Sequence, residues 1–464
     1  MTSVRFLKEA LLLGTLAVAG AGCASYSRQA LPVREPLARG DLAAAESFLV
    51  DKKPGGDGLP YLMELGLVLR YQEKYVDSNQ VFESAENLVD ALYTKSISKE
   101  VLSLLSSDET IPYDGEMWER ALINYYRALN YIDLGNYDGA LVECRKLNHK
   151  LGVYADDFED PPTYRNDAFA LYLTAILYEV GGETNDAWVS LRLADQAYRH
   201  YEEAYGVPTP PSLQRDLIRL ARQQGYTDEE ERLMERFPDA QAPSTADLAR
   251  RAEIVLFWEE GFIPAKIQEE ATIPILKDAK DQDGDRGLWA VSLRDRYYHP
   301  RPYKKKELAY LLRFALPAYP PPTNADRPGW AQLGNGTTTM RSEVVEDLSA
   351  IARAGLDDRM GGILLKSILR ALSKYAVTAG LEKEGGQVAG RVFNFLTAAN
   401  EKADTRSWIT LPKAIQVVRL LVEPGTHDLT LDCYGPTGRL VESVTFEDVT
   451  VEAGEVRFLS HRTF

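Results

Sequence analysis

A pattern of paired amphipathic helices recurs through the first half of this 464-residue chain and limits the folds open to it. In each unit, apolar residues three or four positions apart predict a helix, a short turn follows, and a second apolar stripe predicts its partner helix. Because one helix pair cannot bury its own apolar face, such pairs must stack on one another. The units carry Leu62, Leu65, Gly66, Leu69, Tyr75, Phe82 and Ala85; Asn124, Ala128, Tyr131, Gly135, Tyr137, Ala140, Cys144 and Leu147; and Leu171, Ala175, Tyr178, Gly182, Ala187, Leu191 and Ala194.

These units resemble the tetratricopeptide repeat (TPR), in which a small residue and then an aromatic residue mark the first helix and Gly-x-Tyr marks the turn. The sharpest match is Gly135–Ala140, which reads Gly-Asn-Tyr-Asp-Gly-Ala. The resemblance implies a curved superhelix whose concave groove receives a partner. Because tyrosine combines a large contact area with a polar tip, we expect Tyr125 and Tyr172 to line that groove. For Tyr131 and Tyr178, packing between helices is the preferred interpretation.

The first residues have the layout of a secretory signal peptide. A basic start, a short apolar run and small residues at the exit occupy residues 1–22. The exit resembles a bacterial lipobox, with Gly20 where leucine is usual, and this implies that the Cys23 thiol is acylated and that the signal is cut just ahead of it. A signal cut elsewhere, with Cys23 as a bystander, is the alternative. Ala24 after the cysteine implies export toward the outer membrane, facing the periplasm of a bacterial cell envelope.

The acidic composition narrows the classes of partner. A net charge of −16 and a pI near 5.0 argue against nucleic-acid binding and against broad electrostatic attachment to anionic membranes. Beyond the signal no apolar run is long enough to span a bilayer, so we expect membrane contact only through the lipid on Cys23. For Cys144 and Cys433, buried inert thiols are favoured over a disulfide.

Strand-like segments follow the helical half. Residues 253–258 form an apolar run that ends at Glu-Glu-Gly, and residues 271–275, 288–293 and 308–316 are further strand candidates. Residues 344–400 read as helices. From residue 401, short alternating runs separated by Gly/Pro turns predict a small antiparallel sheet.

The sequence therefore predicts an α+β fold: an N-terminal TPR-like α-solenoid, a mixed α/β segment and a small antiparallel β module at the C-terminus. The predicted divisions are a signal peptide at 1–22, a lipidated tether at 23–36, the helical repeat domain at 37–240, a mixed strand and helix domain at 241–400 and the β module at 401–464.

Nearly the whole mature chain resembles a family of bacterial TPR-containing outer-membrane or periplasmic lipoproteins. The resemblance rests on Cys23, the helical region Tyr61–Ala197, the strand-like Glu253–Pro264 and the segment Ala403–Pro412, which begins Ala-Asp-Thr-Arg-Ser-Trp. The last of these is the most specific part. The resemblance implies no activity, but it links the chain to envelope lipoproteins, some of which resemble activators of penicillin-binding proteins.

Within that segment, Asp404, Arg406 and Trp408 alternate. In an extended segment such residues point to one side, so Arg406 can pair with a carboxylate and Trp408 can cover the pair. We interpret them as a latch between the β module and the helices, because no nucleophile or base lies nearby in sequence. A ligand site is the alternative.

Catalytic and metal signatures are missing from the sequence. It contains no Gly-x-Ser-x-Gly, P-loop, His-Glu-x-x-His or dinucleotide-binding glycine run. Asp281, Asp283 and Asp285 begin like a calcium loop, but Arg286 and Ser292 replace its glycine and glutamate. The scattered histidines lack metal-ligand spacing, and for the acidic loop over residues 154–162 a solvated turn is preferred to a Ca²⁺ site. The sequence thus predicts no catalytic residue, no metal and no cofactor.

The leading hypothesis is a non-enzymatic scaffold that binds other envelope proteins through its helical groove, in support of envelope assembly or cell-wall synthesis. One alternative is a hydrolase of cell-wall or polysaccharide material that uses carboxylates within Asp281–Asp285. Another is a structural subunit of an export or assembly complex.

Overall fold

The computed structural model describes residues 26–53, 56, 58–96, 111–156, 162–277, 307–370 and 402–464. The predicted signal peptide, the acylation candidate Cys23, the aspartates at 281–285 and the strand candidate at 288–293 lie outside the described residues. Among the described residues, no helix combines the length and apolar character needed to cross a bilayer.

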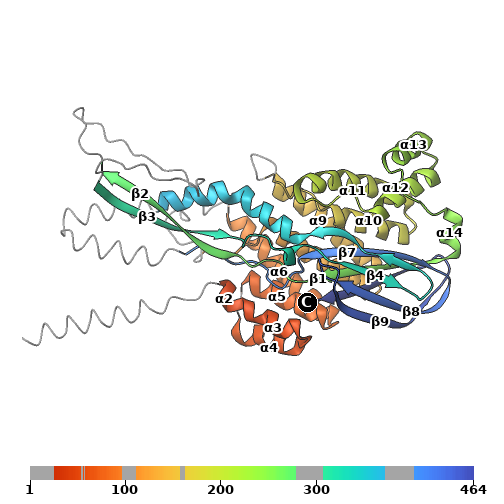
Figure 1. Ribbon diagram of the computed structural model, residues 1–464, viewed down its shortest axis with the longest axis horizontal. Coiled ribbons are helices and arrows are strands. Elements are labelled where there is room, and N and C mark those ends of the chain that lie inside the picture. Colours follow the sequence, from red (N-terminus) through yellow and green to blue (C-terminus); the bar gives the residue numbers. More distant parts are fainter. Residues whose placement is uncertain are drawn as a thin grey trace, which may run out of the picture.

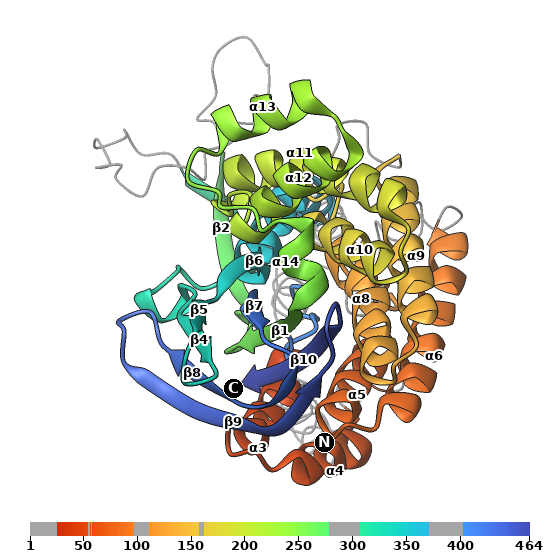
Figure 2. The same cartoon turned by 90° about the vertical axis from the view of Figure 1, so that its right-hand side faces the viewer.

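The predicted helical units form antiparallel hairpins that stack side by side. The hairpins are α5 (Leu59–Tyr71) with α6 (Tyr75–Ser96), α8 (Met117–Asp133) with α9 (Tyr137–Ala155), α10 (Ala168–Val180) with α11 (Thr184–Tyr205), and α12 (Pro211–Gln224) with α13 (Thr227–Arg236). Helix α6 contacts α8, α9 contacts α10, and α11 contacts α12. Figure 2 shows the result as an arc of helices with the strands inside it. The TPR-like solenoid is therefore confirmed.

Local sequence explains where these helices begin and how closely they pack. The Asn136 side chain accepts a hydrogen bond from the Gly139 backbone at 2.9 Å, and Asp167 accepts one from Ala170 at 2.7 Å, so each caps a helix start. Gly66 in α5 faces the ring of Phe82 in α6, which a Cβ atom would approach to 2.6 Å. The small residue of the repeat thus allows the two helices to meet.

The start of the described chain differs from the expected tether. Residues 26–38 form α2 (Tyr26–Ala30), η1 (Leu31–Val33) and α3 (Arg34–Ala38), which lead to α4 (Leu42–Lys52). Tyr26, Ala30, Val33 and Leu37 are buried together. Their spacing of three or four residues forms one helical stripe, so the chain packs onto the solenoid from residue 26 instead of extending freely to residue 36.

The strands form two four-stranded sheets and a hairpin. In order, the first sheet contains β10 (Val456–Thr463), β1 (Ala252–Glu260), β7 (Ala414–Val422) and β6 (Glu343–Asp347), and the second contains β5 (Thr339–Arg341), β4 (Trp330–Gly334), β8 (Gly425–Tyr434) and β9 (Leu440–Val451). Only β1 and β10 pair in parallel in these sheets. Both sheets combine strands from 241–400 with strands from 401–464, so the two predicted divisions build a common β unit.

Strand β1 lies at the centre of three layers. Ile254, Leu256 and Trp258 pack against the second sheet, whereas Val255 and Phe257 join the core formed with the helices. Successive side chains of a strand point to opposite faces, and both faces are covered here. This double burial explains why β1 reads as a continuous apolar run and not as an alternating one.

The remaining strands project from this body. Strands β2 (Ile267–Lys277) and β3 (Glu307–Ala318) form a long antiparallel hairpin. Figure 1 shows the hairpin extending to one side, next to the helix over residues 348–370. The short helix α14 (Thr245–Arg250) leads into β1, and η3 (Asn324–Asp326) lies between β3 and β4.

Candidate functional site

The concave face of the solenoid is occupied by the chain's own first sheet. The Phe169 ring on α10 meets the Phe257 ring on β1 with centroids 5.9 Å apart, and the Tyr198 hydroxyl donates to the Val345 carbonyl at 3.1 Å. Figure 2 shows the sheet within the helical arc. In the described part of the chain, the sheet therefore fills most of the face that the repeats alone predict to be a groove for a partner.

The tyrosines expected along the groove are buried beneath that sheet. Tyr125 is 1% exposed and Tyr172 is fully buried. The Tyr125 ring packs edge-on against Tyr126, with centroids 5.1 Å apart. The Tyr172 hydroxyl donates to Asp216 at 2.9 Å and accepts from Arg419 at 2.7 Å. Tyr172 joins a helix to a strand and Tyr125 packs between helices, so the expectation that these two side chains line an open groove is wrong.

The segment that carries Asp404, Arg406 and Trp408 lies against helices α5, α6 and α8. Arg406 pairs with Asp404 through two bonds, Nε to Oδ1 at 2.8 Å and Nη2 to Oδ2 at 2.7 Å. Its guanidinium carbon lies 5.1 Å from the centroid of the Tyr113 ring, and Nη1 donates to the Ile111 carbonyl. The carboxylate partner of Arg406 is thus its neighbour in sequence, and the pair fixes the strand-like segment against residues 111–113.

Trp408 lies fully buried where this segment meets the helices. Its ring packs against Phe82 of α6 and Tyr126 of α8, with centroids 5.7 and 5.6 Å away. A buried ring of this size contributes a large apolar area to the core around it. This placement agrees with a structural latch, and it leaves the ring no exposed surface for a ligand.

Two buried carboxylates satisfy the backbone of the same segment. Glu119 of α8 accepts from the Trp408 N–H at 2.7 Å, while Glu64 of α5 accepts from the N–H groups of Ile409 and Thr410 at 2.8 and 3.2 Å. Buried backbone donors need such partners, because water does not reach them. Burial raises the pKa of Glu64 to about 7, although these donors oppose the rise. No local pattern in the sequence marks this contact, because the partners are distant along the chain.

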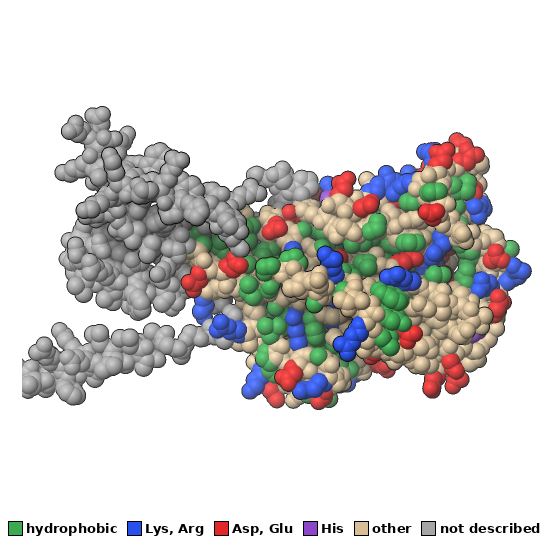
Figure 3. All heavy atoms as spheres, viewed as in Figure 1, with side chains coloured by type: hydrophobic (Ala, Val, Ile, Leu, Met, Phe, Trp, Pro, Cys, Tyr) green, Lys and Arg blue, Asp and Glu red, His purple; other side chains and the backbone are tan. Residues whose placement is uncertain are grey.

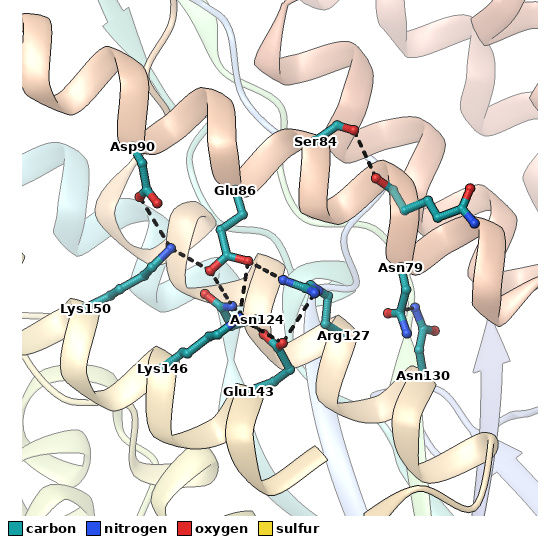
Figure 4. A network of polar contacts seen from close by, with 11 residues as sticks. Asn79, Ser84, Glu86, Asp90, Asn124, Arg127, Asn130, Glu143, Lys146 and Lys150 are labelled. Atoms are coloured by element: carbon teal, nitrogen blue, oxygen red, sulfur yellow. Dashed lines mark hydrogen bonds and ion pairs between the residues drawn. The ribbon is translucent and has the colours of Figure 1, made fainter. Parts of the chain in front are cut away.

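Further polar groups hold the helices to one another. Figure 4 shows Glu86 of α6 at the centre of a cluster with α8 and α9. The Asn124 amide donates to Glu86 at 3.1 Å and to Glu143 at 2.7 Å, Lys150 donates to Glu86 at 2.8 Å, and Arg127 also pairs with Glu86. Glu86 and Glu143 each have cationic partners, so the cluster aligns the hairpins.

A cleft of about 790 Å³ lies over another buried ion-pair network. Arg419 of β7 donates to Glu253 of β1 at 2.6 Å and pairs with Asp216 of α12. Arg219 donates to Asp216 at 3.1 Å and to Glu179 at 2.6 Å. This network could not be predicted from the sequence, where its local signal is a lone arginine within the apolar run of β7.

Two acidic side chains lie next to each other between α10 and β6. Asp167 and Glu346 are each 1% exposed. Tyr164 donates to Asp167 at 2.8 Å, and Tyr201 donates to Glu346 at 3.1 Å. Burial and the neighbouring Asp167 carboxyl raise the pKa of Glu346 well above its usual range. Such a pair favours a shared proton over two charges.

The two cysteines that the structure describes are buried and free, as the sequence predicts. Cys144 lies in α9, and burial raises its pKa to about 12. Cys433 lies on β8 with Glu442 and His461 nearby, and the three ligand atoms are within 4.8 Å of one another. The scattered histidines gave no such grouping in the sequence, because strands β8, β9 and β10 supply one residue each.

Comparisons with known proteins add little to this geometry. No protein-family model matches the chain, and no curated protein matches it significantly. Among solved structures, TPR-like repeats of a candidate kinesin light chain from Podosopora anserina overlap 46% of this chain and 93% of their own, with 15% identity and a TM-score of 0.30. A tetratricopeptide repeat protein from Parabacteroides merdae overlaps 47% of this chain and 80% of its own, with 18% identity and a TM-score of 0.20.

Proposed function

We propose that this chain is a lipid-anchored protein of the bacterial cell envelope that binds another envelope protein through its β2–β3 hairpin. The signal-like residues 1–22 and Cys23 support the anchor. Because the first sheet covers the concave face, we expect the partner to bind at another surface. The observation that carries the proposal is the hairpin itself, which projects from the body in Figure 1.

The hairpin has features of an incomplete sheet. Within the described residues, β2 and β3 pair only with each other. The four residues at the start of β2, Ile267 to Glu270, are all exposed, whereas Phe314 and Ala315 on the facing strand β3 are buried. A two-stranded ribbon is marginally stable alone in water, and its edges offer unpaired N–H and C=O groups to a further strand. A protein that adds a strand or covers a face would stabilise the ribbon.

The hairpin also lies toward the expected anchor. Figure 1 places α2, where the described chain begins, on the side of the body toward which β2 and β3 project. Cys23 precedes Tyr26 by only three positions. An acyl group there would hold the hairpin near the membrane, within reach of a membrane-bound partner. On the face shown in Figure 3, acidic and basic side chains are interspersed, so no charged patch there suggests a different binding surface.

Site-specific photocrosslinking in intact cells tests this proposal. A photoreactive amino acid at Glu269 samples the hairpin, and the same group at Val142, which is 47% exposed on α9, is the matched helical control. We expect a discrete protein adduct from position 269 and none from position 142. Equal adducts from both positions, or none from position 269, would contradict the proposal.

The anchor has its own test. Replacing Cys23 with serine removes the thiol that would carry the acyl group, so labelling of the chain with a radioactive fatty acid is expected to be lost. Labelling that persists in this variant would contradict the lipid anchor. A role as a fixed subunit of an export or assembly complex predicts co-purification with outer-membrane proteins at constant stoichiometry, which separates that role from transient binding.

A further inference from the structure

We propose that Cys433, Glu442 and His461 form a binding site for a zinc-like divalent transition-metal ion. The thiol sulfur, a carboxylate oxygen and a ring nitrogen all lie within 4.8 Å of one another. Zinc accepts sulfur, nitrogen and oxygen ligands together, and three protein ligands leave a fourth position for water or another group. The thiol in this set disfavours Ca²⁺ and Mg²⁺, which prefer oxygen.

The fold brings the three side chains together from separate strands. Cys433 on β8 and Glu442 on β9 are direct cross-strand partners, so their side chains share one face of the second sheet. His461 lies on β10 of the first sheet, which packs against the second. The candidate ion would therefore connect the two sheets, and its binding would stabilise the folded protein because all three ligands must be in place at once.

Neighbouring side chains already orient the carboxylate. The Trp258 indole N–H donates to the Thr463 hydroxyl at 3.0 Å, and this hydroxyl donates to Glu442 Oε2 at 2.8 Å. The His461 ring nitrogen Nε2 lies 3.1 Å from the same oxygen. The bonds through Thr463 lie behind the Glu442 ligand, and such bonds are a regular feature of metal sites, where they fix the ligand's orientation. The contact between His461 and Glu442 joins two ligand groups and would be replaced by their bonds to the ion.

Burial of the three groups suits an ion that enters from one side. Cys433 is fully buried, whereas the side chains of His461 and Glu442 are 16% and 38% exposed. The sulfur is thus shielded at the base of the site, and the other two ligands border solvent. Metal–ligand distances of about 2.0–2.3 Å require the three atoms to draw closer, which rotation of the half-exposed Glu442 side chain can provide.

Cobalt titration tests the site directly, because Co²⁺ bound to a thiolate gives a charge-transfer band in the near ultraviolet. The full chain carrying Cys23→Ser serves as background, so that only Cys144 and Cys433 remain as thiols. We expect one equivalent of Co²⁺ to produce the band and Zn²⁺ to remove it. Cys433→Ser is expected to abolish the band, and Cys144→Ser, the buried-thiol control, to retain it.

Two conservative variants keep the test independent of folding. Glu442→Gln and His461→Gln preserve side-chain size, and each is expected to weaken Co²⁺ binding by at least about 10-fold, the smaller effect seen even for groups behind the ligands. Circular dichroism confirms that each variant folds. The proposal is overturned if the background protein gives no sulfur band, if the band survives Cys433→Ser, or if both glutamine variants bind Co²⁺ as tightly as the background.

Discussion

Trp408 donates its backbone N–H to the Glu119 carboxylate at 2.7 Å, joining positions 289 residues apart in the chain. The Trp408 ring packs between Phe82 and Tyr126 on two helices of the solenoid. This residue therefore connects the segment before β7 with the inner side of the helical arc. The most specific motif of the sequence thus builds a joint between the two layers of the fold, and its loss has a predictable cost.

Replacing Trp408 with alanine is expected to lower the free energy of unfolding by about 3–5 kcal/mol, because it empties a fully buried aromatic site. Urea denaturation measures this loss. Val76→Ala, at a side chain that is 56% exposed, is the control, with an expected change within about 0.5 kcal/mol. A loss below about 1 kcal/mol for Trp408→Ala would show that the joint contributes little.

The raised pKa of Glu64 makes the stability depend on pH. Because the folded-state pKa is about 7 and exceeds the unfolded value, the contribution is fully present below about pH 4.3 and is lost as pH rises through 7. We expect Glu64 alone to remove on the order of 3 kcal/mol of stability across this range. Urea denaturation of the wild type at several pH values between 4 and 8 measures the slope.

Glu64→Gln is the comparison for that slope. The variant cannot titrate, so its stability should change less with pH between 4 and 8. Its stability should be lower at pH 5 by about 1–3 kcal/mol, because one amide group faces backbone donors that now lack an acceptor. An identical pH slope in wild type and variant would assign the dependence to other groups.

The Asp167 and Glu346 pair predicts a substitution that stabilises the protein. Burial and the adjacent carboxyl raise the pKa of Glu346 in the folded protein. The stability that the protonated group contributes is therefore fully present below its pKa in the unfolded chain and is lost as pH rises toward the folded-state pKa. Glu346→Gln removes this loss and can still accept from the Tyr201 hydroxyl. At pH 8 we expect the variant to have a higher melting temperature and a free energy of unfolding that is larger by about 1 kcal/mol. At pH 4 we expect no gain in either quantity. A variant that is destabilised equally at both pH values would contradict this interpretation.

The sequence predicts the elements of this fold better than their assembly. Gly135–Ala140 carries a turn and a helix start in adjacent residues, so the helical hairpin is readable locally. The apolar run of β1 likewise marks a buried strand. The pairing of β1 with β7 and β10 could not be predicted, because these strands lie more than 150 positions later and no short pattern encodes such a pairing. The covered concave face follows from the same long-range pairing.

The candidate site residues divide in the same way. Asp404 and Arg406 are two positions apart, and their ion pair could be anticipated from sequence. Cys433, Glu442 and His461 come from separate strands, so their proximity depends on register and on how two sheets face each other. Helical packing around Gly66 lies between these extremes, since the pattern gives the small residue and the structure gives its contact.

Two helical glycines separate that packing from intrinsic helix propensity. Gly66→Ala directs a Cβ atom to 2.6 Å from the Phe82 ring, which is fully buried and cannot move freely, so we expect a loss of about 1–3 kcal/mol. Gly152→Ala in α9 meets no atom within 4 Å, so the better helix former should add about 0.5–1 kcal/mol. Urea denaturation of both variants measures the contrast. If Gly66→Ala also stabilised the protein, α5 and α6 would not be in close contact at this position, and the stacking of the first hairpin would have to be revised.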